Sequence, residues 1–210
     1  MAKLPEPVEL KLPIAICNEH IAPNTTTIRI RRHLTATFLT DGGDFTISTS
    51  ADGEHGRGLR QYRYFYDASD LPVFSLSMKG NGATWYMQLP GDSTSTSEPI
   101  AVLAPRWNLF TNKMHVYVRN SADNYAEVKL EVRGQVMFRK FTTEVYLDGA
   151  LVMSARVKDI RHFEWVVKVA RGFDISLASA ILLISAWHWY KKGSSSYHGA
   201  SGSRSEKAPS

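Results

Sequence analysis

The chain of 210 residues carries 43% hydrophobic and 11% aromatic residues, so it can bury a core and is not a disordered chain. Its formal net charge of +5 is concentrated in the last twenty residues, which carry +3, and this excludes a strongly basic nucleic-acid-binding body. The single cysteine, Cys17, excludes an intramolecular disulfide and is typical of a cytoplasmic protein.

The first segment, residues 1–24, is expected to be an extended N-terminal arm. Three prolines in its first thirteen residues forbid a regular helix or strand ladder. It has no basic region followed by a continuous apolar one, so it is not a secretory signal. Cys17 and His20 have a spacing that two metal ligands can share, but no second pair with ligand spacing follows. We therefore expect no metal and no other cofactor.

From Thr25 onward, short runs of β-branched and aromatic residues are divided by turn signals, as in an antiparallel sheet. Apolar residues alternate with polar ones at 114–119 and 128–133, the period of a sheet with one solvent-facing side. Asp148-Gly149 is a strong hairpin signal. Roughly ten to twelve short strands without alternating helices exclude a doubly wound nucleotide-binding fold and predict a sandwich or a closed barrel.

The segment from about 174 to 190 is predicted to be a helix with Asp174 as its N-cap. Large apolar residues point in every direction around it, so it must be enclosed by lipid or by protein. Its apolar part would rise about 24 Å, less than the ~30 Å of a bilayer core. We expect the strands to enclose it; a membrane anchor is the alternative. The residues assigned to this buried central helix are Asp174, Ile175, Leu177, Ile181, Leu182, Leu183, Ile184 and Trp187.

The last segment, residues 193–210, is rich in small and polar residues. A chain of this composition cannot bury enough apolar surface to order itself, so we expect a disordered tail. The globular domain is then expected to span residues 25–192.

Four pieces of the sequence resemble the LURP-one-related family of the tubby C-terminal-like superfamily. They are LTDGGDFTIS, RYFYDASDLPVFSLSMKG, EVYLDGALVMSARVKD and VVKVARGFDISLASAILLIS. The resemblance covers about residues 27–190 and implies a mainly β fold, with about twelve antiparallel strands in a closed barrel around the C-terminal helix. Relatives of this fold include phosphoinositide-binding tubby domains and phospholipid scramblases, so the resemblance implies a non-enzymatic module. The basic end of the helix and a Ser/Thr-rich loop at 91–98 depart from the family pattern and leave the specific partner open.

Candidate site residues are basic rather than catalytic. The seven histidines are scattered, and neither a nucleophile elbow nor a phosphate-cradling glycine loop occurs, so we expect no enzyme activity. Arg29 and Arg31 share one face of a predicted strand and have Arg32 beside them, while Lys191 and Lys192 end the helix. These five residues are candidates for holding a phosphorylated lipid headgroup. The alternative interpretation of the arginines is the solvated outer face of a sheet.

The sequence therefore predicts a soluble, cytoplasmic, monomeric module, peripheral at membranes, that binds phospholipid or phosphoinositide headgroups or a protein partner. We expect no nucleic-acid partner. The alternative is a membrane-anchored or scramblase-like protein that uses the C-terminal helix as a transmembrane segment.

Overall fold

The computed structural model describes residues 4–32, 45–48, 53–59, 62–67, 69–79, 84–91, 98–107, 112–137, 140–159 and 164–195. The strands in this part of the chain are β1 (Thr26–Arg32), β2 (Phe45–Ser48), β3 (Gly53–Leu59), β4 (Tyr62–Tyr66), β5 (Pro72–Lys79), β6 (Thr84–Gln88), β7 (Ala101–Trp107), β8 (Asn112–Asn120), β9 (Ala126–Met137), β10 (Lys140–Leu147), β11 (Ala150–Asp159) and β12 (Glu164–Val169). The helices are α1 (Ile175–Ser195) and the short 3-10 helices η1 (Asn18–His20) and η2 (Ser121–Asp123). The prediction of a mainly β, antiparallel fold with one C-terminal helix is confirmed.

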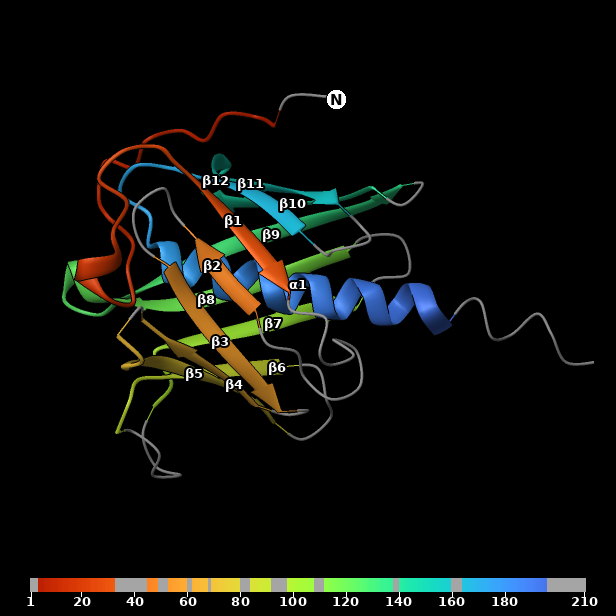
Figure 1. Cartoon of the computed structure of the whole chain (residues 1–210). Helices are drawn as coiled ribbons and strands as arrows, with labels where there is room; N and C mark the ends of the chain where they lie inside the picture. The colour runs from red at the N-terminus through yellow and green to blue at the C-terminus, as the bar shows by residue number, and fades with distance from the viewer. Residues whose placement is uncertain are drawn as a thin grey trace, which may run out of the picture.

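Every strand pairs antiparallel with its neighbours in the chain, and β1 also pairs with β12 (Figure 1). This second pairing of β1 closes the strand order on itself, as a barrel. Ile28 and Ile30 of β1 lie opposite Val167 and Trp165 of β12, so apolar residues face the same side across the junction.

The hairpin between β10 and β11 turns at the two residues predicted for it. Asp148 and Gly149 both have positive φ, at 49° and 84°. Two successive residues in this region match the right-handed twist of the flanking strands, which is why Asp-Gly favours such turns.

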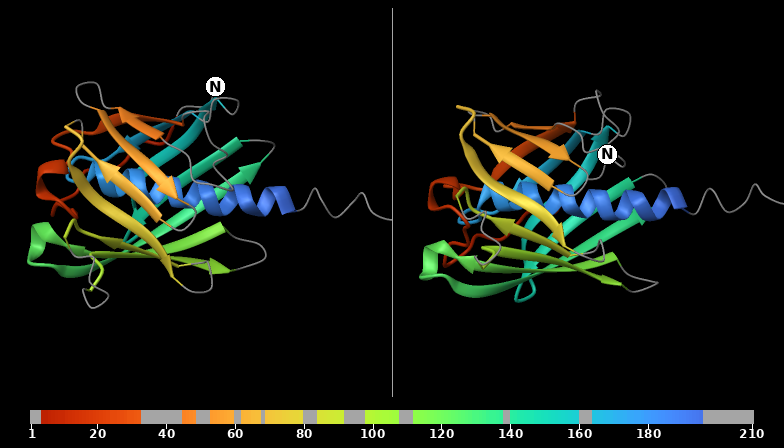
Figure 2. Two further views of the ribbon diagram at one scale, coloured as in Figure 1. Left: turned by 60° about the horizontal axis from the view of Figure 1, so that its bottom comes forward. Right: turned by 90° about the horizontal axis from the view of Figure 1, so that it is seen from below.

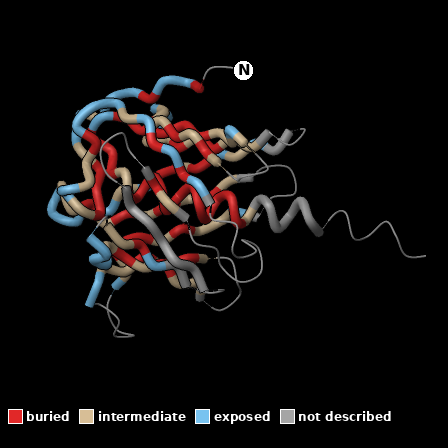
Figure 3. Tube along the Cα trace, viewed as in Figure 1, coloured by how far each residue is buried: buried red, intermediate tan, exposed pale blue. Residues whose placement is uncertain are grey.

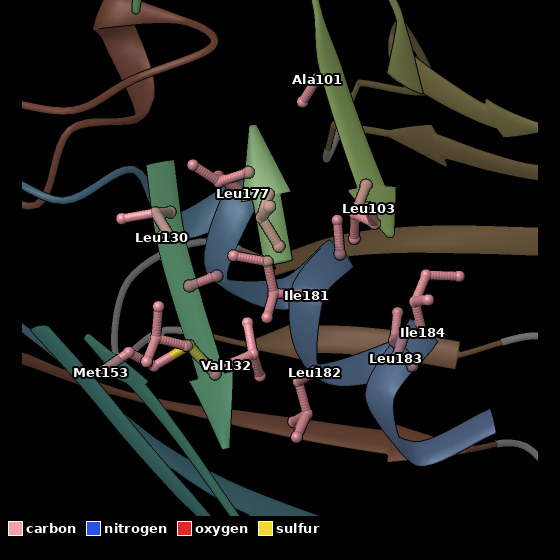
Figure 4. Close-up of a cluster of buried hydrophobic side chains, with 14 of the residues drawn as sticks. Ala101, Leu103, Leu130, Val132, Met153, Leu177, Ile181, Leu182, Leu183 and Ile184 are labelled. Carbon is pink, nitrogen blue, oxygen red and sulfur yellow. The ribbon is translucent and has the colours of Figure 1, made fainter. Parts of the chain in front are cut away.

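Buried residues alternate with less buried ones along strands such as β6 and β12 (Figure 3). In β6, Trp85 and Met87 are fully buried while their neighbours are half-buried. Figure 4 shows side chains of α1 among those of the surrounding strands, with Leu177 and Ile181 close to Leu130 and Val132 of β9. The sheet thus supplies apolar partners for the helix.

Helix α1 is buried on all sides from Ser176 to Trp187, and no residue in that stretch is more than 6% exposed. Ile175 is half-buried. In the described part of the chain, no helix combines the length and apolar character needed to cross a membrane. The alternative that placed this helix in a bilayer as a transmembrane segment is therefore wrong.

The C-terminal end of α1 differs from the prediction. The helix continues to Ser195 instead of ending near Tyr190, and its last turns extend beyond the strands (Figure 2). The expected disordered tail is thus helical over its first three residues, 193–195, because propagation of an existing helix is easier than nucleation. The rest of that segment, 196–210, lies outside the described residues.

The N-terminal arm is extended, and it packs across one end of the barrel. Its backbone N–H groups donate to distant carbonyls: Val8 to Leu151 at 2.7 Å and Ile14 to Gly172 at 2.9 Å. Ala15 is fully buried. The arm therefore belongs to the folded unit, although its prolines prevent it from forming a regular strand.

Candidate functional site

The two ends of the barrel are distinguished by where α1 begins and ends. Helix α1 begins at the end covered by the N-terminal arm, which we call the arm end, and leaves at the opposite end, the exit end (Figures 1 and 2). Because β1 runs antiparallel to β12, Arg31 lies opposite Glu164, the first residue of β12, at the exit end. The ends of β7, β9 and β11 and the starts of β8, β10 and β12 also lie at the exit end, since successive antiparallel strands run in opposite directions.

The fold brings four of the five predicted headgroup residues to the exit end. Arg31 and Arg32 end β1, and Lys191 and Lys192 lie in the last turns of α1. Arg29 lies two residues closer to the middle of the barrel, and it is exposed on the same outer face as Arg31. The side chains of Arg32, Lys191 and Lys192 lie outside the described part of the structure.

Basic and acidic residues are distributed unequally between the two ends of the barrel. We count the described residues at strand termini, at the positions next to them and in the segments that join strands. At the exit end the basic residues are Arg31, Arg32, Arg63, Lys79, Arg106, Lys113, Lys140, Lys158, Lys191 and Lys192, and the acidic ones are Asp159 and Glu164. At the arm end the acidic residues are Glu6, Glu9, Glu19, Glu54, Asp67, Asp70, Glu98, Asp123, Glu127, Asp148 and Asp174, and the basic ones are Lys11, Arg119, Lys168 and Arg171. The described part of the molecule is therefore electrically polar along the barrel axis.

Two of the four exit-end cations whose side chains the structure describes contact carboxylates. Lys158 contacts Glu164 at 2.9 Å, and Lys113 contacts Glu131 at 3.0 Å. The side chain of Arg31 is exposed and has no carboxylate within salt-bridge distance among the described residues. This end can therefore attract anionic surfaces.

A buried carboxylate joins the arm to the start of α1 at the arm end. Asp174 Oδ1 accepts from the N–H groups of Ser176 at 2.7 Å and Leu177 at 3.0 Å, which confirms the predicted N-cap. Its Oδ2 accepts from the N–H groups of Ile16 at 2.9 Å and Cys17 at 3.0 Å. Burial raises the pKa of Asp174, and these N–H donors oppose that shift by stabilising the charged form.

Asp174, His20 and Ser176 have the residue types of a hydrolase triad, but they serve structure. His20 Nδ1 lies 2.7 Å from Ser176 Oγ, whereas the carboxylate oxygens of Asp174 accept hydrogen bonds from backbone N–H groups. Both Ser176 and Asp174 are fully buried, so no substrate reaches them. Among the described residues, no three His, Cys, Asp or Glu side chains are grouped to hold a metal, so Cys17 and His20 gain no further ligand.

An ionic group on the outer face of β8–β10 surrounds Glu131. Arg133 donates two hydrogen bonds to its carboxylate, at 2.9 and 3.2 Å, and Lys113 adds a contact at 3.0 Å. The guanidinium of Arg133 lies 4.4 Å from the ring centroid of Tyr146. The bonds from Arg133, followed by those from Lys113, lower the pKa of Glu131 to about 2.

Replacing Glu131 with glutamine should lower the free energy of unfolding at pH 7 by about 0.5–1 kcal/mol, a value limited by solvent screening of this half-exposed group. The folded-state pKa is depressed, so the stabilisation is complete above pH 4.5 and is lost as the pH falls toward 2. Urea unfolding of both proteins at several pH values measures this difference. A difference in unfolding free energy that stays constant down to pH 3 would contradict the lowered pKa of Glu131.

Strands β1 to β12 and the enclosed part of the helix lie within a segment that matches a known family. The profile of the LURP-one-related family matches residues 26–186, from β1 to the enclosed turns of α1. The chain belongs to the LURP-one-related family. No curated protein matches the chain significantly. In this LURP-one-related protein the N-terminal arm and the last turns of α1 lie outside the matched segment.

Sequence reasoning found the arginines of β1 and the lysines of α1 but missed the other exit-end cations of this LURP-one-related protein. Lys79, Arg106 and Lys140 each lie at or next to a strand terminus. The signal was present in the sequence, because alternate connections of an antiparallel sheet meet at one end. It could be used only once the strand boundaries were known.

Proposed function

We propose that this LURP-one-related protein is a non-enzymatic, monomeric module that binds anionic phospholipid headgroups at the cytoplasmic surface of a membrane through its exit end. The observation that carries the proposal is the separation of charge along the barrel axis. Basic residues gather where α1 leaves the barrel, and acidic residues gather at the arm end. A molecule polarised in this way orients itself end-on toward an anionic surface.

The distance between the two ends makes this orientation effective. From Ile175 to Lys191, α1 rises about 24 Å. This exceeds the Debye length of about 8 Å at physiological ionic strength, so the acids of the arm end do not cancel the attraction at the exit end. Each Lys or Arg near an anionic leaflet contributes about 1 kcal/mol.

The shape of the exit end supports the same proposal. The last turns of α1 extend beyond the strands (Figure 1). The backbone of α1 at Lys191 and Lys192 therefore comes nearer to an approaching leaflet than the strand termini do, and Arg31 follows at the rim. Contacts with several headgroups at once add up, although each is weak.

Co-sedimentation with vesicles tests the proposal. Vesicles of phosphatidylcholine with 30% phosphatidylserine should retain the protein, and vesicles of phosphatidylcholine alone should not. The double variant Lys191→Glu, Lys192→Glu should bind the anionic vesicles at least about tenfold more weakly, because two reversed charges remove at least about 2 kcal/mol.

The matched control is the double variant Lys11→Glu, Arg171→Glu, which makes the same charge change at the arm end. Both residues are exposed, and the contact of Arg171 with Glu9 is a loose 3.7 Å. This variant should bind within about threefold of the wild type. Equal, negligible binding of the wild type to both kinds of vesicle would remove the lipid function and leave a protein partner as the target of the exit end.

A further inference from the structure

The outer wall of the barrel carries a further group of polar side chains on β7, β8 and β9, which shares Arg106 with the exit end. We call Arg106, His115, Tyr117 and Lys129 the wall cluster. Inward and outward residues alternate along β8, which puts His115 and Tyr117 on the outer face. Tyr117 lies opposite Lys129 of β9. Arg106 of β7 lies opposite Lys113 of β8, two residues before His115.

The hydrogen bonds within the wall cluster fix which of its groups can donate outward. Arg106 Nε donates to His115 Nδ1 at 3.2 Å, and Arg106 Nη2 donates to Tyr117 Oη at 3.4 Å. Because Nδ1 accepts, the imidazole is neutral and carries its proton on Nε2. Tyr117 Oη accepts from Arg106 and keeps its own O–H to donate. The wall cluster therefore turns N–H and O–H donors to the solvent.

The charge around His115 is mainly positive. Burial, followed by the charges of Lys129, Arg106 and Lys113, lowers the pKa of His115, and the charge of Glu131 opposes them. Glu131 is itself engaged by Lys113 and by Arg133 of β9, as described above.

Arg106 and Lys129 are the cations that remain for a ligand. Arg106 bonds to the neutral groups of His115 and Tyr117. Neither Arg106 nor Lys129 has a carboxylate within salt-bridge distance among the residues that the structure describes. On the next strand, Glu144 lies opposite Arg133 and accepts from Tyr146.

We propose that the wall cluster is a binding site for a phosphate monoester. Such a group carries up to two negative charges, which match the two cations left without a carboxylate, and its three terminal oxygens accept from several donors at once. A carboxylate has one charge and two oxygens and would leave donors unused. The proposal goes beyond the exit-end function, because the wall cluster faces sideways and binds its ligand without a membrane.

Titration with inorganic phosphate, followed by NMR, tests the site in solution. We expect saturable shifts at the His115 and Tyr117 resonances, and sodium chloride at equal ionic strength should not produce them. Bound phosphate should also raise the pKa of His115, since an anion stabilises the imidazolium. The variants Arg106→Gln and Lys129→Gln should each bind phosphate about tenfold more weakly, because each removes a charge-assisted hydrogen bond.

The matched control is Arg119→Gln, which removes one positive charge from the same strand, β8. Arg119 lies at the arm end, where it contacts Glu98 at 2.8 Å, so this variant should bind phosphate like the wild type. The proposal is overturned if phosphate gives no saturable shift, or if all three variants bind it equally. Vesicle binding does not enter this result, so failure of the wall cluster and failure of the exit-end function are separate outcomes.

Vesicles of two compositions then identify the source of the monoester. Phosphatidic acid carries a phosphate monoester and phosphatidylglycerol a diester, and the two are compared at matched surface charge. A preference for phosphatidic acid that Lys129→Gln abolishes would assign the site to a lipid headgroup. Equal binding to both, with phosphate binding in solution intact, would assign it to a soluble phosphate monoester.

Discussion

Asp174→Ala should lower the free energy of unfolding by about 3–4 kcal/mol. The change removes the helix N-cap, worth about 1 kcal/mol, and leaves the buried N–H of Ile16 and the part-buried N–H of Cys17 without an acceptor, at about 1–3 kcal/mol each. Relief of the desolvation of the carboxylate offsets part of this loss. Urea denaturation at pH 7 measures the change.

The substitution Asp174→Asn separates the two roles of this carboxylate. An amide keeps one acceptor oxygen but turns an NH₂ group toward two of the four N–H donors, so its effect should lie between those of wild type and alanine. Asp123→Ala, an exposed acidic residue of η2, is the control and should change stability by less than about 0.5 kcal/mol. If the free energy of unfolding of Asp174→Ala lies within 1 kcal/mol of the wild type, Asp174 does not stabilise the contact between the N-terminal arm and α1.

Trp85→Ala should cost about 3–5 kcal/mol, since it removes a fully buried indole from the interface between β6 and α1. Trp85 packs edge-on against Trp187 of the helix, with ring centroids 5.5 Å apart. Trp187→Ala should have a similar cost, because Trp187 is only 6% exposed.

A double-mutant cycle then isolates the contact between strand and helix. The combined variant should lose less stability than the two single variants together, by a coupling energy of about 0.5–1.5 kcal/mol. Leu71→Ala, at a site that is 62% exposed, is the control and should be nearly neutral. Purely additive losses would show that the two rings contribute separately rather than as a packed pair.

The local features of the fold could be predicted from the sequence because they depend on neighbouring residues. Two-residue alternation predicted β8 and β9, Asp148-Gly149 predicted the hairpin, and Asp174 predicted the start of α1. The apolar character of α1 on all sides indicated that other parts of the chain cover it. These signals lie within about a dozen residues each.

The docking of the N-terminal arm could not be predicted in the same way. Several of its partners are main-chain carbonyls more than 140 residues away, as in the bond from Val8 to Leu151, and a backbone carbonyl carries no sequence signature. Asn120 shows the same problem. Its side chain accepts from the N–H of Ala15 and donates to the carbonyl of Pro13, across a separation of more than 100 residues.

Only those features of the candidate sites that depend on residues within one strand could be predicted from the sequence. Arg29 and Arg31 were placed on one face by the two-residue period, and this holds in β1. The sequence could not show that Arg31 and Lys191 share an end, because that depends on which strand pairs with β1. The wall cluster was missed because Arg106 meets His115 and Tyr117 only through the register between β7 and β8.

The pairing of β1 with β12 constrains how the chain is made. Strand β1 is synthesised long before β12, so the pair that closes the barrel forms late. Helix α1 is synthesised later still and has to lie inside the barrel before β1 and β12 pair. Until then Ile28 and Ile30 belong to an unpaired edge, which invites association between nascent chains. Contacts between opposite ends of a sequence also slow folding. We therefore expect newly made chains to need protection by chaperones until β12 and α1 have been synthesised.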